Sequence, residues 1–468
     1  MKKKLIVIAL CIVLTVSALA GCGKKDEKAD NKEVAGVTDA GENGNDNAGD
    51  NGDDGSDVTG KEEKPAKTWE TKEDYRVSDA YTVPESIKDS KFDMEEALSI
   101  IPLKEAAAPY FKFGMAMTGN QASTFAVKSP EMRELLKYHC NTTTATNLMK
   151  PQYMLVQAEC KKASASGIED PVLDFTVTDE ALAFCQENGI GMRGHTLVWH
   201  AQTPDWFFRV GYDENNDYVD ADTLKYRMES YIRQMLTHCQ DKYPGVVYCW
   251  DVVNECVEVG DKETESGWYC RKSGQSPNDT NQWYDILGYE YVELAFTYAR
   301  KYAAEGVSLV YNDYNTQDSI KCAAICELLK YLKGKGLIDA FGMQCNLSVD
   351  VDLSKIFYTI AQYAKTGLEL QVTELNIVAA DTSEESYKIQ ADAYYKFMKF
   401  IMASDNSNGG SANITVVNVF SLMDGYLLYA SDSNNYCLFD KDIQPKPNYY
   451  SIIDALVETG KHNTDILK

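Results

Sequence analysis

Eight nearly continuous apolar segments, rich in β-branched and aromatic residues, constrain the fold of this chain more than any other feature. Such segments are typical of strands that are buried on both faces of a parallel sheet. Between them, apolar residues recur at helical spacing. Eight alternations of strand and helix predict an α/β fold, a closed (β/α)8 TIM barrel. The predicted strands are Phe111–Met117, Thr144–Met149, Gly191–Trp199, Val246–Glu255, Ser308–Asn315, Ala340–Leu347, Leu368–Asn376 and Ile414–Ser421.

An open doubly wound sheet would also alternate strands with helices. The nucleotide-binding form of that fold carries Gly-x-Gly-x-x-Gly after its first strand. No such motif follows the first predicted strand here, so the closed barrel is favoured. We expect a single folded domain over residues 81–460.

The first 68 residues differ in composition from the rest. Three lysines, an apolar run and Leu19-Ala20-Gly21-Cys22 resemble a bacterial lipoprotein signal, in which residues 1–21 are removed and Cys22 is lipidated. A plain secretory signal is the alternative. Residues 22–68 are rich in Gly, Asn and Asp and predict a disordered acidic linker. We therefore expect the protein to be anchored in membrane lipid through Cys22, on the extracellular side of the cell membrane.

Charge and cysteine usage exclude some classes of function. A formal net charge of −25 argues against nucleic acid as a partner, because a basic surface is needed to neutralise phosphates. Of 13 cysteines, Cys11 is lost with the signal and Cys22 is lipidated, and the other eleven are scattered. This scatter predicts mostly buried thiols and no disulfide framework. We expect a monomer without a metal or other cofactor.

Two of the predicted strands lead into a glutamate, at Trp250–Glu255 and at Val372–Glu374. An unpaired carboxylate there is costly to desolvate, so the pattern indicates function. Reactive side chains of such barrels lie at the C-terminal ends of strands, where Glu255 and Glu374 can face each other. Retaining glycosidases hold two carboxyl groups about 5–5.5 Å apart on either side of the cleaved bond. A structural ion pair is the alternative.

The motifs around these glutamates, from about Leu98 to Leu456, resemble glycoside hydrolase family 10. They are His195–His200, Trp250–Glu255, Asn312–Asn315 and Val372–Leu375. The resemblance implies a retaining endo-β-1,4-xylanase that acts on xylan or a related β-glycan, with Glu255 as acid/base and Glu374 as nucleophile. Positions that match the sugar contacts of the family are Asn147, Lys150, His195, Trp199, Gln202, Asn254, Tyr314 and Gln344.

Some of these side chains have simpler interpretations. His195 lies within an apolar run and is alternatively a core imidazole, and Trp199 or Tyr314 is alternatively a packing residue. Lys150 is alternatively a solvated charge at a helix start.

Two departures from the family pattern concern the nucleophile. Asn346 stands where the family usually has His, and Asn376 stands where it usually has Asp. In the family, those residues support the nucleophile through hydrogen bonds. Because an amide both donates and accepts but does not titrate, we expect Asn346 and Asn376 to support Glu374 with a different pH response.

Other departures concern the sugar pockets. Thr146 replaces a glutamate that grips sugar in the family, and Phe420 and Leu428 replace tryptophans that roof the site. These changes predict a wider pocket, or one for a decorated or different β-glycan. Two alternative functions follow: hydrolysis of another β-glycan, and glycan binding by a non-catalytic lipoprotein.

Overall fold

The computed structural model describes residues 75, 84–119, 122–260, 266–274, 280–425 and 435–458. These residues lie in one compact unit that extends from Trp69 to Lys468. The predicted signal, Cys22, the linker and Leu428 lie outside the described residues. Among the helices described, none combines the length and the apolar character that a membrane span requires.

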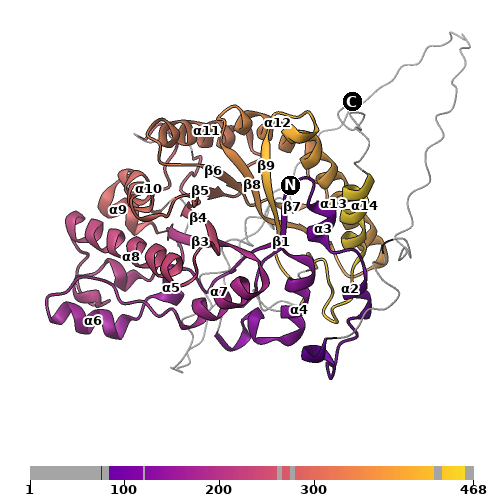
Figure 1. Cartoon of the computed structure of the whole chain (residues 1–468). Helices are drawn as coiled ribbons and strands as arrows, with labels where there is room; N and C mark the ends of the chain where they lie inside the picture. Colours follow the sequence, from indigo (N-terminus) through magenta and orange to yellow (C-terminus); the bar gives the residue numbers. More distant parts are fainter. Residues whose placement is uncertain are drawn as a thin grey trace, which may run out of the picture. The chain divides into compact units, whose positions relative to one another are not determined.

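The centre of the unit is a closed barrel of eight parallel strands (Figure 1), as predicted. The ring is closed by the pairing of its first strand with its last, in which Phe113 lies opposite Val417. In order around the barrel, the strands are β1 (Lys112–Met115), β2 (Thr142–Thr144), β3 (Gly191–Trp199), β4 (Val247–Asn254), β5 (Ser308–Asp313), β6 (Ala340–Met343), β8 (Glu369–Val378) and β9 (Asn413–Val419).

The second and sixth predicted strands differ most from the structure, whereas the bounds of the others agree to within a few residues. The second strand ends at Thr144, because the β-branched residues of β2 precede the apolar run that predicts this strand. The predicted sixth strand divides into β6 and a short β7 (Asn346–Ser348), which pairs with β8. The division falls at Cys345, whose φ of 55° lies in the left-handed region and interrupts the ladder.

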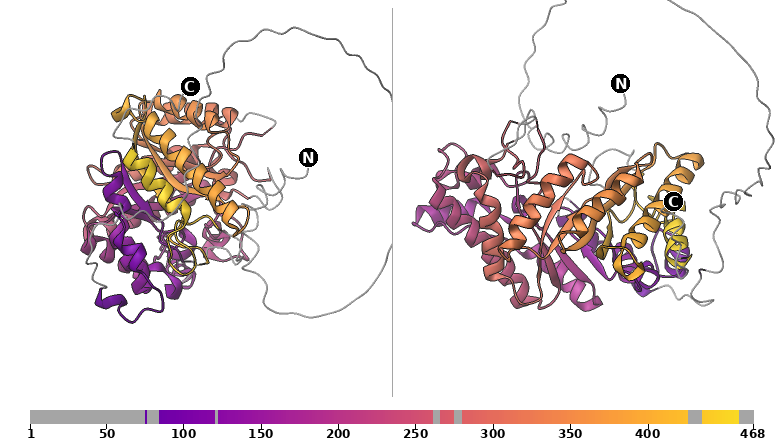
Figure 2. Two further views of the ribbon diagram at one scale, coloured as in Figure 1. Left: turned by 90° about the vertical axis from the view of Figure 1, so that its right-hand side faces the viewer. Right: turned by 90° about the horizontal axis from the view of Figure 1, so that it is seen from above.

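Helices flank the barrel on its outer side, as the two further views in Figure 2 show. Among the described helices, five begin with an Asp or Ser side chain that accepts a hydrogen bond from a first-turn backbone N–H, namely α4, α8, α11, α12 and α13. The helices are α2 (Glu95–Ser99), α3 (Leu103–Ala107), α4 (Pro130–His139), α5 (Pro151–Met154), α6 (Gln157–Ala165), α7 (Thr176–Asn188), α8 (Ala221–Lys242), α9 (Gln282–Leu287), α10 (Glu290–Tyr302), α11 (Ser319–Gly334), α12 (Leu353–Ala364), α13 (Glu384–Ser404) and α14 (Pro447–Glu458).

Close packing fixes how β3 lies against β4. Gly194 pairs with Trp250, and a Cβ atom at Gly194 would lie 2.3 Å from the Trp250 ring. Only glycine therefore leaves room for this tryptophan, which is fully buried. The contact holds the C-terminal ends of β3 and β4, and the side chains that follow them, in a fixed position.

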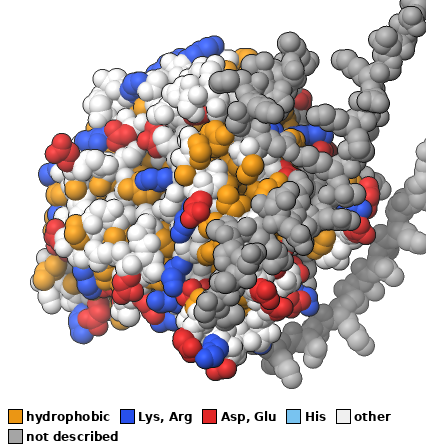
Figure 3. Space-filling model, turned by 45° about the vertical axis from the view of Figure 1, so that its right-hand side comes forward, with side chains coloured by type: hydrophobic (Ala, Val, Ile, Leu, Met, Phe, Trp, Pro, Cys, Tyr) orange, Lys and Arg blue, Asp and Glu red, His pale blue; other side chains and the backbone are white. Residues whose placement is uncertain are grey.

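The cysteines of the described residues are all free and buried, which confirms the prediction of buried thiols. On the face drawn in Figure 3, acidic and basic side chains lie interspersed, with apolar side chains gathered between them.

Candidate active site

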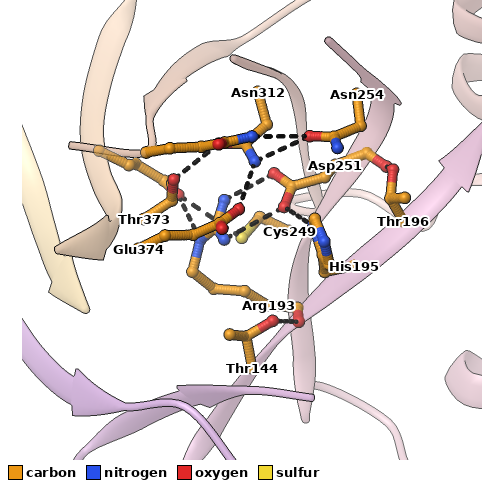
Figure 4. A network of polar contacts seen from close by, with 12 residues as sticks. Thr144, Arg193, His195, Thr196, Cys249, Asp251, Asn254, Asn312, Thr373 and Glu374 are labelled. Carbon is orange, nitrogen blue, oxygen red and sulfur yellow. Dashed lines mark hydrogen bonds and ion pairs between the residues drawn. The ribbon is translucent and has the colours of Figure 1, made fainter. Parts of the chain in front are cut away.

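A buried ion pair lies beneath the mouth of the barrel (Figure 4). Arg193 on β3 places Nη2 2.7 Å from Oδ1 of Asp251 on β4, and Nη1 3.2 Å from Oδ2. Nδ1 of His195 lies 2.9 Å from Asp251 Oδ2. Burial acts to raise the pKa of Asp251, but Arg193 and His195 outweigh it, so this pKa lies below its ordinary value. The pair fixes the His195 ring, whose charge acts on the predicted nucleophile Glu374.

Glu374 is held by a neighbouring amide. The buried Asn312, near the end of β5, donates through Nδ2 to Glu374 Oε1 at 3.0 Å and to Asn254 Oδ1 at 2.9 Å. Thr373 donates to Asn312 Oδ1 at 2.7 Å. The acceptor end of this amide is thereby occupied, so its donor end must face Glu374.

Burial raises the pKa of Glu374 above its ordinary value, and the nearby charge of Glu255 acts in the same direction. His195, Lys150 and the hydrogen bond from Asn312 oppose the rise. Burial and Glu255 thus favour the neutral form of the Glu374 carboxyl group, whereas His195, Lys150 and Asn312 favour its anion. This balance is suited to a group that must be ionised near neutral pH yet lose its charge on reaction.

Glu255 follows β4 and is held by two donors. Trp199 Nε1 donates to Oε2 at 2.9 Å, and Gln344 Nε2 donates to Oε1 at 2.7 Å. The backbone of Glu255 has a φ of 57°, in the left-handed region. Arg271 Nε donates to its carbonyl oxygen at 3.0 Å, which holds this sparsely populated conformation.

Three polar atoms connect the two carboxyl groups. Asn312 Nδ2 contacts Glu374 and Asn254 Oδ1, and Gln344 Nε2 lies 3.4 Å from the same Asn254 oxygen and 2.7 Å from Glu255. A chain of hydrogen bonds therefore links the two glutamates, which stand at the C-terminal end of β4 and within β8.

A second group of predicted sugar-contacting residues lies where β2 and β3 lead into their loops. Lys150 Nζ donates to Gln202 Oε1 at 2.8 Å and to Asn147 Oδ1 at 3.1 Å. It also lies 4.7 Å from the centroid of the Trp199 ring. Burial lowers the pKa of Lys150 to about 8, although Glu374 and Glu255 both act to raise it. Lys150 is buried, so the interpretation as a solvated charge is wrong.

Tyr314 lies on another side of the mouth, after β5. Its hydroxyl donates to Glu258 Oε2 at 2.8 Å and accepts from Arg271 Nη2 at 2.8 Å. Lys321 Nζ lies 3.7 Å from the centroid of its ring. Tyr314 and Glu258 line a cavity of about 600 Å³ that extends toward the start of α12.

The residues that differ from the pattern of glycoside hydrolase family 10 lie at separate places in the structure. Thr146 is buried, and its hydroxyl has no hydrogen-bond partner among the described residues. Phe420 directly follows β9 and is half-buried. Asn346 donates to Gln344 Oε1 at 3.1 Å, while Asn376 donates to Asn346 and, at 3.2 Å, to the backbone oxygen of Glu374. Support of Glu374 by these two amides stays a prediction, because the hydrogen bonds of Asn346 lead to Gln344.

A family model described as glycosyl hydrolase family 10 matches residues 102–455. The chain belongs to glycosyl hydrolase family 10. It is 45% identical over 317 residues to a putative endo-1,4-beta-xylanase of Caldicellulosiruptor saccharolyticus, which covers 66% of this chain and 96% of that protein. It is 39% identical over 360 residues to endo-1,4-beta-xylanase B of Butyrivibrio fibrisolvens, covering 76% of this chain but 53% of that protein.

Solved structures of similar proteins agree with the family 10 fold. The endo-1,4-beta-D-xylanase 10B of Clostridium thermocellum, in complex with xylohexaose, superimposes with a TM-score of 0.68 at 31% identity, over 78% of this chain and 69% of that chain. An intracellular xylanase of Thermoanaerobacterium saccharolyticum, in complex with xylotriose, gives a TM-score of 0.63 at 29% identity, over 75% and 98%.

Sequence reasoning missed several contributors to the family 10 site, among them Asp251 and Asn312 as well as three residues with less visible signals. Arg193 and Gln371 lie within predicted strands, and Arg193 Nε donates to Gln371 Oε1 at 2.8 Å across the barrel interior. Their signal was a polar residue inside an apolar run, at a position that faces the barrel axis. Arg271 lies in a polar stretch far from any strand, and nothing in its surroundings marked it.

Proposed function

We propose that the protein hydrolyses internal β-1,4 bonds of xylan by double displacement, with retention of anomeric configuration. The observation that carries the proposal is the unbroken chain of hydrogen bonds between Glu255 and Glu374 at the barrel mouth. Two carboxyl groups that face one space are the arrangement that this chemistry requires. The named activities of the related xylanases support xylan as the substrate.

In the first step, the Glu374 carboxylate attacks the anomeric carbon while Glu255 gives its proton to the leaving oxygen. The glycosidic bond breaks, and an ester joins the sugar to Glu374. In the second step, Glu255 takes a proton from water as the water oxygen attacks the same carbon. The ester breaks, the sugar leaves with its original configuration, and both glutamates return to their starting states.

Two groups of side chains would bind sugar on either side of this reaction. Lys150, Asn147 and Gln202 already orient one another by hydrogen bonds, so their remaining donors and acceptors are fixed before a sugar binds. Trp199 offers a ring for sugar stacking as well as its bond to Glu255. Tyr314 and the cavity beside it would receive the leaving-group side of the chain.

Azide separates the two carboxylate roles. Glu374→Ala should release no sugar from xylan, but with azide and an activated aryl xylobioside it should form a glycosyl azide of inverted configuration. Glu255→Ala should keep activity on the activated substrate, and azide should then give a product of retained configuration. Thermal unfolding of each variant controls for folding. Absence of sugar release by the folded wild type, from xylan and from related β-glycans, would refute the proposal.

Hydrolysis of a different or decorated β-glycan is a second candidate. It is favoured by Thr146, whose buried hydroxyl cannot grip sugar as the family glutamate does, and by Phe420. Products from arabinoxylan, glucuronoxylan and mixed-linkage glucan should be compared. Calorimetry with xylo-oligosaccharides tests the third candidate, a non-catalytic binder, which predicts heat of binding without turnover.

We also propose that the protein is a monomeric lipoprotein, held by Cys22 on the extracellular side of the cell membrane. Support comes from the lysines, apolar run and Leu19-Ala20-Gly21-Cys22 at the start of the chain. Labelled fatty acid should be incorporated into the wild type and not into Cys22→Ala. Release of the wild type without detergent, at the same rate as Cys22→Ala, would contradict anchoring.

A further inference from the structure

We propose that Asn376 and Asn346 form a relay that positions Glu255, by fixing which end of the Gln344 amide faces the acid/base. The inference rests on the proposed function, in which Glu255 delivers and recovers a proton. It assigns the two departures from the family pattern to the acid/base, whereas the sequence suggested the nucleophile.

The Gln344 amide lies between partners of opposite kinds. Its Nε2 donates to Glu255 Oε1 at 2.7 Å, and Asn254 Oδ1 lies 3.4 Å from the same nitrogen. Its Oε1 accepts from Asn346 Nδ2 at 3.1 Å. Because the two ends of an amide have nearly the same shape, only these partners decide its orientation. Gln344 is buried, so water has little access to either end.

The direction of the hydrogen bonds in the relay is set at one end by a group that can only accept a hydrogen bond. Asn376 Nδ2 lies 3.2 Å from the backbone oxygen of Glu374, which only accepts hydrogen bonds. The same nitrogen donates to Asn346 Oδ1, which leaves Asn346 Nδ2 for Gln344. Asn346 and Asn376 are paired residues on β7 and β8, so the strand ladder holds them side by side. Each amide therefore turns its donor end toward the next residue, up to Glu255.

The relay itself carries no titratable group, although charged groups surround Glu255. Glu374 faces it from β8, Lys150 from the start of α5, and Asp313 and Tyr314 from the end of β5. Arg271 contacts its backbone. Apart from Arg271, which stays protonated, these groups can gain or lose a proton as pH changes, whereas an amide relay presents the same donor to Glu255 at every pH.

Replacing Asn346 by a carboxylate should reverse the relay. An ionised Asp accepts but does not donate, so Asn346→Asp draws the donor end of Gln344 away from Glu255 and turns Oε1 toward it. That oxygen binds only the protonated form of Glu255. The alkaline limb of the kcat/KM profile should move up by about one pH unit. Asn346 is exposed, so the variant should fold.

A matched variant separates orientation from added charge. Ser348 is exposed and lies two residues further along β7, so it points to the same side as Asn346. Ser348→Asp adds the same charge there without replacing the donor to Gln344. We expect its alkaline limb to stay near that of the wild type. An equal displacement in both variants would overturn the relay.

A further variant tests positioning against a merely structural role. Asn346→Leu removes the donor, and Gln344 is then free to turn. Hydrolysis of a xyloside with a poor leaving group should fall about 5- to 10-fold. The kcat/KM of an activated aryl xyloside, which reports a first step that needs little proton donation, should change much less. Equal slowing of both substrates would assign Asn346 to support of the nucleophile or of the fold, and the relay would be wrong.

The relay and the proposed function fail in different ways. An inactive wild type refutes the function. In that case a titration of the labelled Glu255 carboxyl by carbon NMR, which needs no turnover, still compares wild type with Asn346→Asp. A midpoint that is the same in both proteins refutes the relay even if the wild type is a fully active xylanase.

Discussion

The polar interior of this barrel has two layers that use opposite means. The ionic floor, formed by Arg193, Asp251 and His195, is buried and held by charge. The amide layer lies between the two glutamates and along the relay and is neutral; it consists of Asn254, Asn312, Gln344, Asn346 and Asn376.

The two layers differ because the ionic floor keeps its charges during turnover, whereas the amide layer lies beside groups that gain and lose protons. A buried ion pair is strongly destabilised when one partner is lost, because the other charge stays unpaired. Such a pair is suited to a support that does not change during turnover. Next to groups that gain and lose protons, amides provide direction without adding a charge that would disturb them.

The largest difference should appear in stability. Asp251→Ala leaves Arg193 buried without its carboxylate, so the free energy of unfolding should fall by about 3–5 kcal/mol. Asn346→Ala, at an exposed position of the amide layer, removes one hydrogen bond between neutral groups and should lower it by only about 0.5–1.5 kcal/mol. Urea unfolding followed by circular dichroism measures both. Similar losses in the two variants would remove the distinction between the layers.

A smaller effect, on kcat/KM, should follow from loss of the donor that contacts the other carboxylate oxygen of Glu255. Trp199→Phe removes the Nε1 donor to Glu255 Oε2 and keeps an aromatic ring. A hydrogen bond to a charged group contributes about 1.5–3 kcal/mol, so kcat/KM for a substrate with a poor leaving group should fall about 10- to 100-fold. Unfolding should be little affected. A loss confined to KM would instead assign Trp199 to sugar stacking alone.

The smallest effect should come from Lys150 at the edge of both layers. Its pKa of about 8 means that it is charged below this pH and neutral above it. The charge of Lys150 lowers the pKa of Glu374, and in the proposed function it also binds sugar, so KM should rise a few-fold as pH passes 8. Lys150→Met should have the higher KM at every pH. The same step near pH 8 in this variant would assign the titration to another group.

The fold and the pairing of the glutamates could be predicted from sequence because both depend on local signals. Apolar runs give the strands, and closure of the barrel brings Glu255 and Glu374 together. The break at Cys345 could not be predicted, because it depends on one left-handed residue in an apolar run. The partner of Arg193 depends on the register between β3 and β4, which shifts twice along their length.

The orientation of the Asn346 side-chain amide could not be predicted from the sequence either. The residue types at 346 and 376 show that donors and acceptors are present, but not which neighbour receives them. That choice follows from the backbone oxygen of Glu374, whose position requires the folded β7–β8 pair.

The reactivity of the buried cysteine thiols can report which parts of the barrel open transiently. Burial raises the pKa values of Cys140, Cys239 and Cys249 to about 12, so the reactive thiolate is scarce while the barrel stays closed. An alkylating reagent should therefore modify them only in molecules that have transiently opened. Mass spectrometry of each modified cysteine would then map which strands and helices separate first.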